Sequence, residues 1–122
     1  MIKKWYIDSG CSRHMTGKKE NLRDFRSLKN AGVVKFGNNQ KCQVKGYGKI
    51  KNGQFTVNRV SYVEGLQPNL ISVSQLVVGT GNQVLFNEEG SIISNVHTKE
   101  VLIKSKRKGD MFTLDINSIM GT

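Results

Sequence analysis

Short apolar runs separated by polar turn residues recur along the whole chain. Gly or Asn interrupts these runs about every ten residues, a spacing that is typical of strands joined by tight turns. Thirteen residues are Gly and only one is Pro, so Gly and Asn supply most of the turn positions. The pattern predicts an all-β domain with strands over residues 5–7, 33–36, 43–50, 54–63, 83–87, 91–94, 101–104 and 111–116.

Three joins between these runs carry residues that tolerate positive φ angles. They are Gly37-Asn38-Asn39, Lys51-Asn52-Gly53 and Glu88-Glu89-Gly90. Each join is expected to form a hairpin turn, so the strands on its two sides should pair as antiparallel neighbours.

One segment, residues 72–78, has the apolar spacing of a short helix. Ser72 can cap its first turn and Gly79 can end it. Residues 17–32 form a polar connection. Three apolar residues within it predict a turn of helix or a docked loop: Leu22, Phe25 and Leu28.

The length of 122 residues suits a single domain with one modest core. Nineteen Lys and Arg against nine Asp and Glu give a net charge of +10, which attracts polyanions but does not by itself indicate specific recognition. Most basic residues are scattered. The one block, residues 104–108, is interpreted as a solvated hairpin in preference to a dedicated RNA site.

Two cysteines, Cys11 and Cys42, cannot build a framework of several disulfides. The N-terminus does not resemble a signal peptide, and no apolar run is long enough to span a bilayer. We therefore expect reduced thiols and a soluble cytosolic protein.

The triplet Asp8-Ser9-Gly10 ends the first apolar run, and no second Asp-Ser-Gly follows. Gly10 permits close approach of the backbone to a partner, and the small residues Cys11 and Ser12 leave room for a substrate main chain. The arrangement suits a carboxylate presented from a tight loop. If this is the active loop of an aspartic protease, each chain holds half of an active site and only a dimer can catalyse.

A second motif, V-S-Y-V-E-G-L-Q-P-N-L-I-S-V-S-Q-L, covers residues 60–76. Together with W-Y-I-D-S-G-C-S-R-H-M-T-G at residues 5–17, it resembles the protease region of copia-type retrotransposon polyproteins, a branch of the retropepsin-like aspartic proteases. The resemblance spans roughly residues 5–87. It implies a protease core over residues 1–90 and a β extension over residues 91–122 that leads toward the integrase region.

The fold implied by this resemblance is a retropepsin-like half-barrel with one short helix, expected to pair as a homodimer. Asp8 matches the catalytic aspartate, Ser9 the hydroxyl residue that braces the loop across the dimer, and Gly10 the residue that leaves space beside the scissile bond. Ser72 and Val73 depart from the Gly and Arg of the retroviral pattern. The flap that closes over substrate corresponds to Phe36, Gly37, Asn38, Asn39 and Gln40.

The resemblance also implies the chemistry. Two Asp8 carboxylates share one proton and activate one water against a peptide bond, without metal or cofactor. The implied substrate is a Gag-Pol polyprotein within a cytoplasmic virus-like particle. The dimer seam is expected at residues 1–6 and 83–87, unless the chain after Asn87 covers it. The alternative is a non-catalytic or domesticated retropepsin-like domain that binds RNA or protein, with non-specific nucleic acid contact through its basic surface.

Other chemistries are less well supported by the sequence. Cys11 is interpreted as a small packed residue and not a nucleophile, because His14 would have to fold back to reach it. Zinc ligands could come from Cys11, His14, Cys42 and His97, but their spacing lacks the usual short pairs. Trp5 and Tyr6 are expected in the core or at the dimer edge. A nucleotide-stacking face is not expected, because the other aromatics do not alternate with basic residues.

Overall fold

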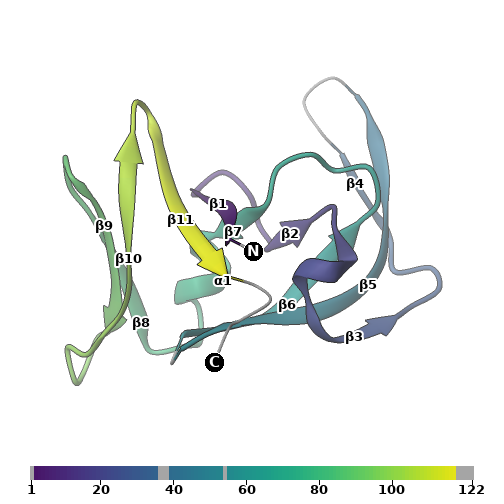
Figure 1. The fold of residues 1–122 in the computed structure, drawn as a ribbon. Helices are drawn as coiled ribbons and strands as arrows, with labels where there is room; N and C mark the ends of the chain where they lie inside the picture. The colour runs from purple at the N-terminus through teal and green to yellow at the C-terminus, as the bar shows by residue number, and fades with distance from the viewer. Residues whose placement is uncertain (1, 36–38, 54, 118–122) are drawn as a thin grey trace.

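The computed structural model describes residues 2–35, 39–53 and 55–117 (Figure 1). These residues form eleven strands, one α-helix of five residues and one turn of 3-10 helix, which confirms the all-β fold. The elements are β1 Ile2–Asp8, β2 Met15–Thr16, η1 Lys19–Asn21, β3 Arg23–Ser27, β4 Val33–Lys35, β5 Lys41–Asn52, β6 Phe55–Val63, β7 Leu70–Ser72, α1 Val73–Val77, β8 Asn82–Phe86, β9 Gly90–Asn95, β10 Val101–Lys108 and β11 Met111–Asn117.

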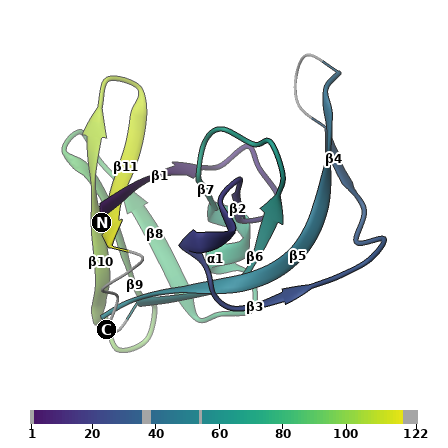
Figure 2. The same ribbon diagram turned by 45° about the vertical axis from the view of Figure 1, so that its right-hand side comes forward.

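Ten of the strands follow one another in the order β3-β5-β6-β2-β7-β1-β11-β10-β9-β8, and β4 pairs separately with β5. The long strands β5 and β6 bend around β2 and η1, so the sheet curls into a barrel-like shape (Figure 2). The larger buried core lies around Trp5, Ile71 and Leu114. A second cluster around Met15, Val44 and Val63 supports the other half of the barrel.

All eight predicted strands are present in the described part of the chain, although Phe36 and Gln54 lie outside it. Antiparallel pairing of β5 with β6 and of β8 with β9 confirms the hairpins predicted at residues 51–53 and 88–90. Strands β4 and β5 also pair antiparallel, from Val33 opposite Gln43 to Lys35 opposite Lys41. Their turn lies outside the described residues apart from Asn39 and Gln40.

The polar connection over residues 17–32 contains a turn of 3-10 helix, η1, in agreement with the predicted turn of helix. It also contains strand β3, which the sequence did not predict. Two glycines of β5 make room for it. A Cβ atom added to Gly48 would lie 2.7 Å from Cβ of Leu22, and one added to Gly46 would lie 2.6 Å from the ring of Phe25. The apolar residues of this segment therefore dock onto β5 at two positions where β5 has no side chain. Leu28 is the exception, because 47% of it is exposed.

The predicted helix is confirmed as α1. Its cap is Ser72, whose Oγ accepts a hydrogen bond from the backbone N of Gln75 at 3.2 Å. Gly79 follows the helix at φ +74°, a left-handed conformation that favours glycine. Within the described residues no helix is long and apolar enough to cross a membrane.

The C-terminal strands extend the same sheet. β11 pairs antiparallel with β1 over six positions, from Ile2 opposite Asn117 to Ile7 opposite Phe112. The other edge of β1 pairs in parallel with β7. Within one chain β11 therefore occupies one edge of β1, and β7 occupies the other edge at residues 6–8, which matches, for the described residues of the β1 part of the expected seam, the alternative in which the segment after Asn87 covers it. In the described chain β8, which holds most of the other part, is the end strand of the sheet and pairs with β9 alone.

Candidate active site

Asp8 is the last residue of β1 and lies beside Ser72 in the parallel pairing with β7. The backbone N–H of Gly10 donates a hydrogen bond to Asp8 Oδ1 at 2.7 Å, which fixes the direction of the carboxylate. A Cβ atom at Gly10 would lie 3.1 Å from the same oxygen, so glycine leaves space where the loop is tightest. Asp8 is half-buried and Ser9 and Gly10 are exposed. The loop thus holds its carboxylate at the protein surface.

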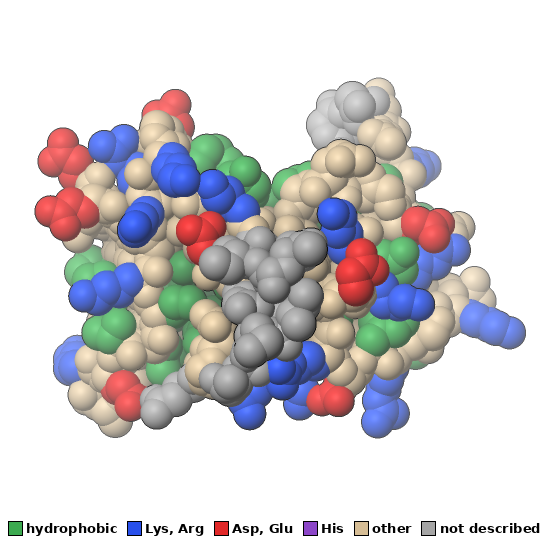
Figure 3. All heavy atoms as spheres, viewed as in Figure 1, with side chains coloured by type: hydrophobic (Ala, Val, Ile, Leu, Met, Phe, Trp, Pro, Cys, Tyr) green, Lys and Arg blue, Asp and Glu red, His purple; other side chains and the backbone are tan. Residues whose placement is uncertain are grey.

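Two cavities flank this carboxylate, and Asp8 and Leu70 line both. One, of about 440 Å³, lies between the loop and strand β4. The other, of about 390 Å³, lies between the loop and the start of β11, where Asp110 and Met111 form part of its wall. Figure 3 shows the surface dipping between the β4–β5 hairpin and the β10–β11 hairpin, which supply the outer walls. Together the cavities form a cleft with Asp8 at its middle.

The structure brings only part of the predicted substrate site to this cleft. Cys11 and Ser12 line the first cavity beside Asp8. Asn39 and Gln40 are exposed on the β4–β5 hairpin and do not line it, and the remaining predicted flap residues, 36–38, lie outside the described chain. Sequence reasoning missed a further set of lining residues, from the loop and from β2, β4 and β7: Arg13, Met15, Val33, Val34, Lys35 and Leu70.

Ser72, His14 and Gln75 tie the Asp8 loop to the start of helix α1. Ser72 Oγ donates to the backbone oxygen of Cys11 at 2.8 Å, and Ser72 N donates to His14 Nδ1 at 2.9 Å. The backbone N of His14 donates to Gln75 Oε1 at 2.8 Å. Ser72 departs from the glycine of the retroviral pattern, yet its hydroxyl supplies a direct link between helix and loop.

A second polar network joins the end of the first motif to the second motif. Thr16 Oγ1 donates to Asn69 Oδ1 at 2.6 Å, and Asn69 Nδ2 donates to the backbone oxygen of Lys4 at 3.0 Å. Gly17 packs so closely that an added Cβ atom would lie 1.8 Å from the backbone oxygen of Leu66. The two sequence motifs are therefore one structural unit that holds the Asp8 loop from both sides.

A family model described as "Pol polyprotein, beta-barrel domain" matches residues 5–82. The chain belongs to this family. The match runs from β1 to the start of β8 and so includes the Asp8 loop, the β4–β5 hairpin and α1. No curated protein and no solved structure matches the chain. The molecule is thus the β-barrel region of a retroelement Pol polyprotein, and strands β9–β11 lie beyond the matched residues.

Cys11 and His14 do not form an activated pair in this Pol β-barrel domain. Burial, with the nearby charge of Asp8, raises the pKa of the Cys11 thiol to about 11, so the thiolate is disfavoured. Burial lowers the pKa of His14 to about 4, and its Nδ1 already accepts the Ser72 hydrogen bond. His14 is 2% exposed and acts as a neutral structural acceptor.

The structure also shows where the candidate zinc ligands, the aromatic residue Trp5 and the basic block lie. Across the described residues, no three His, Cys, Asp or Glu side chains lie close enough to hold a metal ion. His97 is exposed, and Trp5 is fully buried in the core. The basic block at residues 104–108 lies entirely on β10, with Lys104, Lys106 and Lys108 exposed.

Proposed function

We propose that this Pol β-barrel domain is a copia-type aspartic endopeptidase that cleaves its own Gag-Pol polyprotein. The observation that carries the proposal is the Asp8 carboxylate, oriented by the Gly10 N–H in the middle of a surface cleft. A carboxylate in this position can take a proton from a water that attacks a peptide carbonyl. The proposed place of action is the cytoplasmic virus-like particle.

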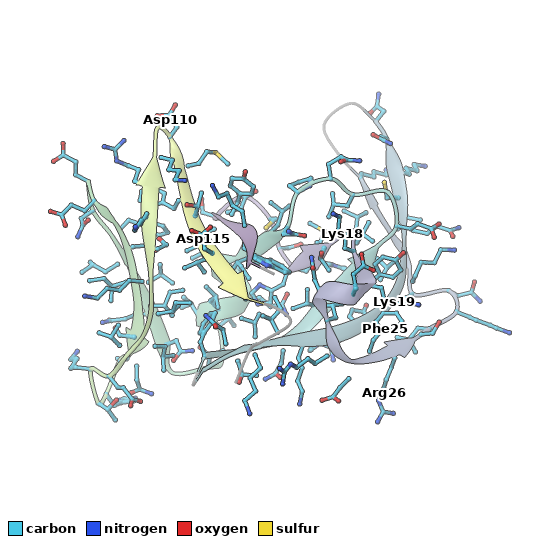
Figure 4. The ribbon with its side chains drawn as sticks, viewed as in Figure 1. Lys18, Lys19, Phe25, Arg26, Asp110 and Asp115 are labelled. Atoms are coloured by element: carbon cyan, nitrogen blue, oxygen red, sulfur yellow. The ribbon has the colours of Figure 1, made fainter. Side chains whose placement is uncertain are left out.

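The chemistry needs a second carboxylate, because one group removes a proton from water while the other polarises the carbonyl. We propose that a second copy of the chain supplies it, with its own Asp8, so that a homodimer forms the complete site. The second loop is proposed to approach on the side of Ser9, which is exposed and lines the cavity between the loop and the start of β11. Asp110 is the other acidic residue among those lining the two cavities, and it lies at the tip of the β10–β11 hairpin (Figure 4).

The substrate is proposed to bind as an extended strand between the β4–β5 hairpin and the Asp8 loop. In the described chain β4 pairs with β5 alone, so its second edge is open to an added strand. Main-chain hydrogen bonds then hold the peptide, and side-chain pockets set the preference. Val33, Val34 and Leu70 supply apolar wall around the cleft, which suits apolar residues beside the cleaved bond.

Processing of an extended precursor with matched Asp→Asn substitutions tests this function. Asp8→Asn keeps the size of the side chain but removes the base, so cleavage should fall by about 10²-fold or more. Asp110→Asn removes a carboxylate from the same cavity and should leave cleavage nearly unchanged. Normal cleavage by Asp8→Asn rejects the protease and leaves the binding-domain alternative. Equal loss in both variants instead makes Asp110 the second carboxylate of a monomer.

A further inference from the structure

Strand β5 carries a row of basic residues on its outer face. Residues 44, 46, 48 and 50 are buried, whereas Lys45, Tyr47 and Lys49 are half-buried and Lys51 is exposed. Since successive side chains of a strand point to opposite faces, these four residues project from the outside of the barrel. One aromatic residue, Tyr47, is therefore flanked by lysines on this face, an arrangement that sequence reasoning did not single out.

Neighbouring strands add further cations around Tyr47. Arg26 of β3 is directly opposite Tyr47 in the β3–β5 ladder, so both side chains are on the same face. The guanidinium carbon of Arg59 lies 5.4 Å from the centre of the Tyr47 ring. Arg59 has φ 56°, at an irregularity in the β5–β6 pairing. This irregular backbone carries Arg59 at the position where it lies over the aromatic ring.

Two hollows run along this face. The first, about 770 Å³, is lined by residues that include Arg26, Tyr47, Lys49 and Arg59. The second, about 650 Å³, includes Lys29 and Lys45, and the two share Leu28. Figure 4 shows Arg26 extending below β3, away from the barrel, and Figure 3 shows Lys and Arg side chains gathered along the lower rim of the molecule.

The acidic side chain that lines these hollows is Asp24, which is 3.0 Å from Lys49 Nζ. The Asp24 side chain is 73% exposed and that of Lys49 is 41% exposed, so solvent weakens this ion pair and a stronger anion can compete for Lys49. The balance of charge along the hollows remains strongly positive: Arg26, Lys29, Lys45, Lys49 and Arg59.

We propose that this outer face of β5, which we call the Tyr47 face, binds single-stranded nucleic acid. A row of cations follows a phosphate backbone, and an aromatic ring offers a surface on which an unpaired base can stack. An acidic peptide would be held by the cations alone and has no base to stack on the Tyr47 ring. The face is formed by β3, β5 and β6. The hollow around Tyr47 shares no lining residue with the two cavities beside Asp8, whereas the second hollow shares Val33 with the cavity between the loop and β4.

Fluorescence anisotropy with labelled oligouridylate tests the proposal through two variants of equal charge. Lys45→Gln/Lys49→Gln/Arg59→Gln removes three cations from the Tyr47 face, and Lys104→Gln/Lys106→Gln/Lys108→Gln removes three from β10. The first variant should bind at least 10-fold more weakly. It should also reduce the slope of log K against log salt by about 2, because each lost phosphate contact is worth roughly 0.7. The second variant should bind like the parent protein.

A second pair of variants tests stacking. Tyr47→Leu should weaken binding roughly 5-fold or more, whereas Tyr47→Phe, which keeps the ring, should bind like the parent. Thermal unfolding of each variant checks that the fold is intact. Equal losses in the two triple variants overturn the proposal, because they indicate diffuse attraction by net charge. Unchanged binding by Tyr47→Leu, or binding to anionic vesicles or heparin but not to oligouridylate, also overturns it.

Discussion

Ser72 Oγ donates a hydrogen bond to the backbone oxygen of Cys11 and at the same time accepts one from the N–H of Gln75. A single fully buried hydroxyl thus caps helix α1 and anchors the loop that carries Asp8. Because the loop is tied to the helix, the direction of the Asp8 carboxylate depends on residues more than sixty positions away in the sequence. This explains why the two motifs must occur together.

Ser72→Ala should destabilise the fold by about 1–3 kcal/mol, because it removes a helix cap and leaves a polar group of the loop without its partner. Ser74→Ala is the matched control. Ser74 is exposed on the same helix, so this substitution should lower the free energy of unfolding only slightly. Denaturant unfolding measures both. Equal costs for the two variants contradict the role given to Ser72.

His14 makes stability depend on pH. Its pKa is about 4 in the folded protein and about 6.5 when unfolded, so the unfolded state takes up a proton first as the pH falls. The free energy of unfolding is therefore not reduced by His14 above pH 6.5. As the pH falls from 6.5 toward 4, it should decrease by about 3 kcal/mol. His14→Asn keeps an acceptor for the Ser72 N–H but cannot titrate. Its unfolding free energy should therefore fall less over this range than that of the parent.

This titration is also expected to limit the proposed activity in acid. The proposed pair of carboxylates works best on the acid side, where one of them stays protonated. The parent should lose activity at low pH through unfolding, and His14→Asn should retain activity to lower pH. The test is to measure activity against pH for the two proteins, together with their unfolding on the same samples. If activity declines at the same low pH in both proteins, His14 does not control this decline.

The proposed dimer is expected to use the Ser9 side of the cleft, since β11 and β7 already pair with β1 within one chain. Met111 is 48% exposed and lines this cavity, as Phe86 does. Met111→Ser should raise the concentration at which dimers form, as measured by sedimentation. Val101→Ser is the control, because Val101 is 47% exposed but lies outside both the cavity and the expected seam. If the dimer interface lies elsewhere, both variants should dimerise at the same concentration as the parent.

The strands with their own apolar run or turn signal were predictable from local patterns, and so was helix α1. Strands β2, β3 and β7 were not, because β2 and β7 have two and three residues and β3 has a polar sequence. Their conformation depends on partners distant in sequence, such as Ser61 for Met15 and Tyr47 for Arg26. Tertiary pairing, not local preference, makes these segments strands.

The sequence predicts the Asp8 loop of the candidate site, because its motif is a continuous segment. It does not predict most of the residues that line the cavities. Val33 and Val34 were predicted as a strand, yet nothing in the sequence places them across a cavity from Asp8. The Tyr47 face left a signal in the alternation of Lys45, Tyr47, Lys49 and Lys51. The approach of Arg59 to Tyr47 depends on the irregular β5–β6 pairing, which the sequence does not reveal.

Mixing active and inactive chains tests most directly whether each chain supplies half of the catalytic site. Parent protein is held at a fixed concentration above the dimer midpoint, and Asp8→Asn protein is added to roughly threefold excess. Random pairing should then reduce peptide cleavage to about a quarter, because most parent chains acquire a partner without a carboxylate. Asp110→Asn added in the same way should leave the rate nearly unchanged. A cleavage rate that does not fall with added Asp8→Asn contradicts a site shared between two Asp8 residues.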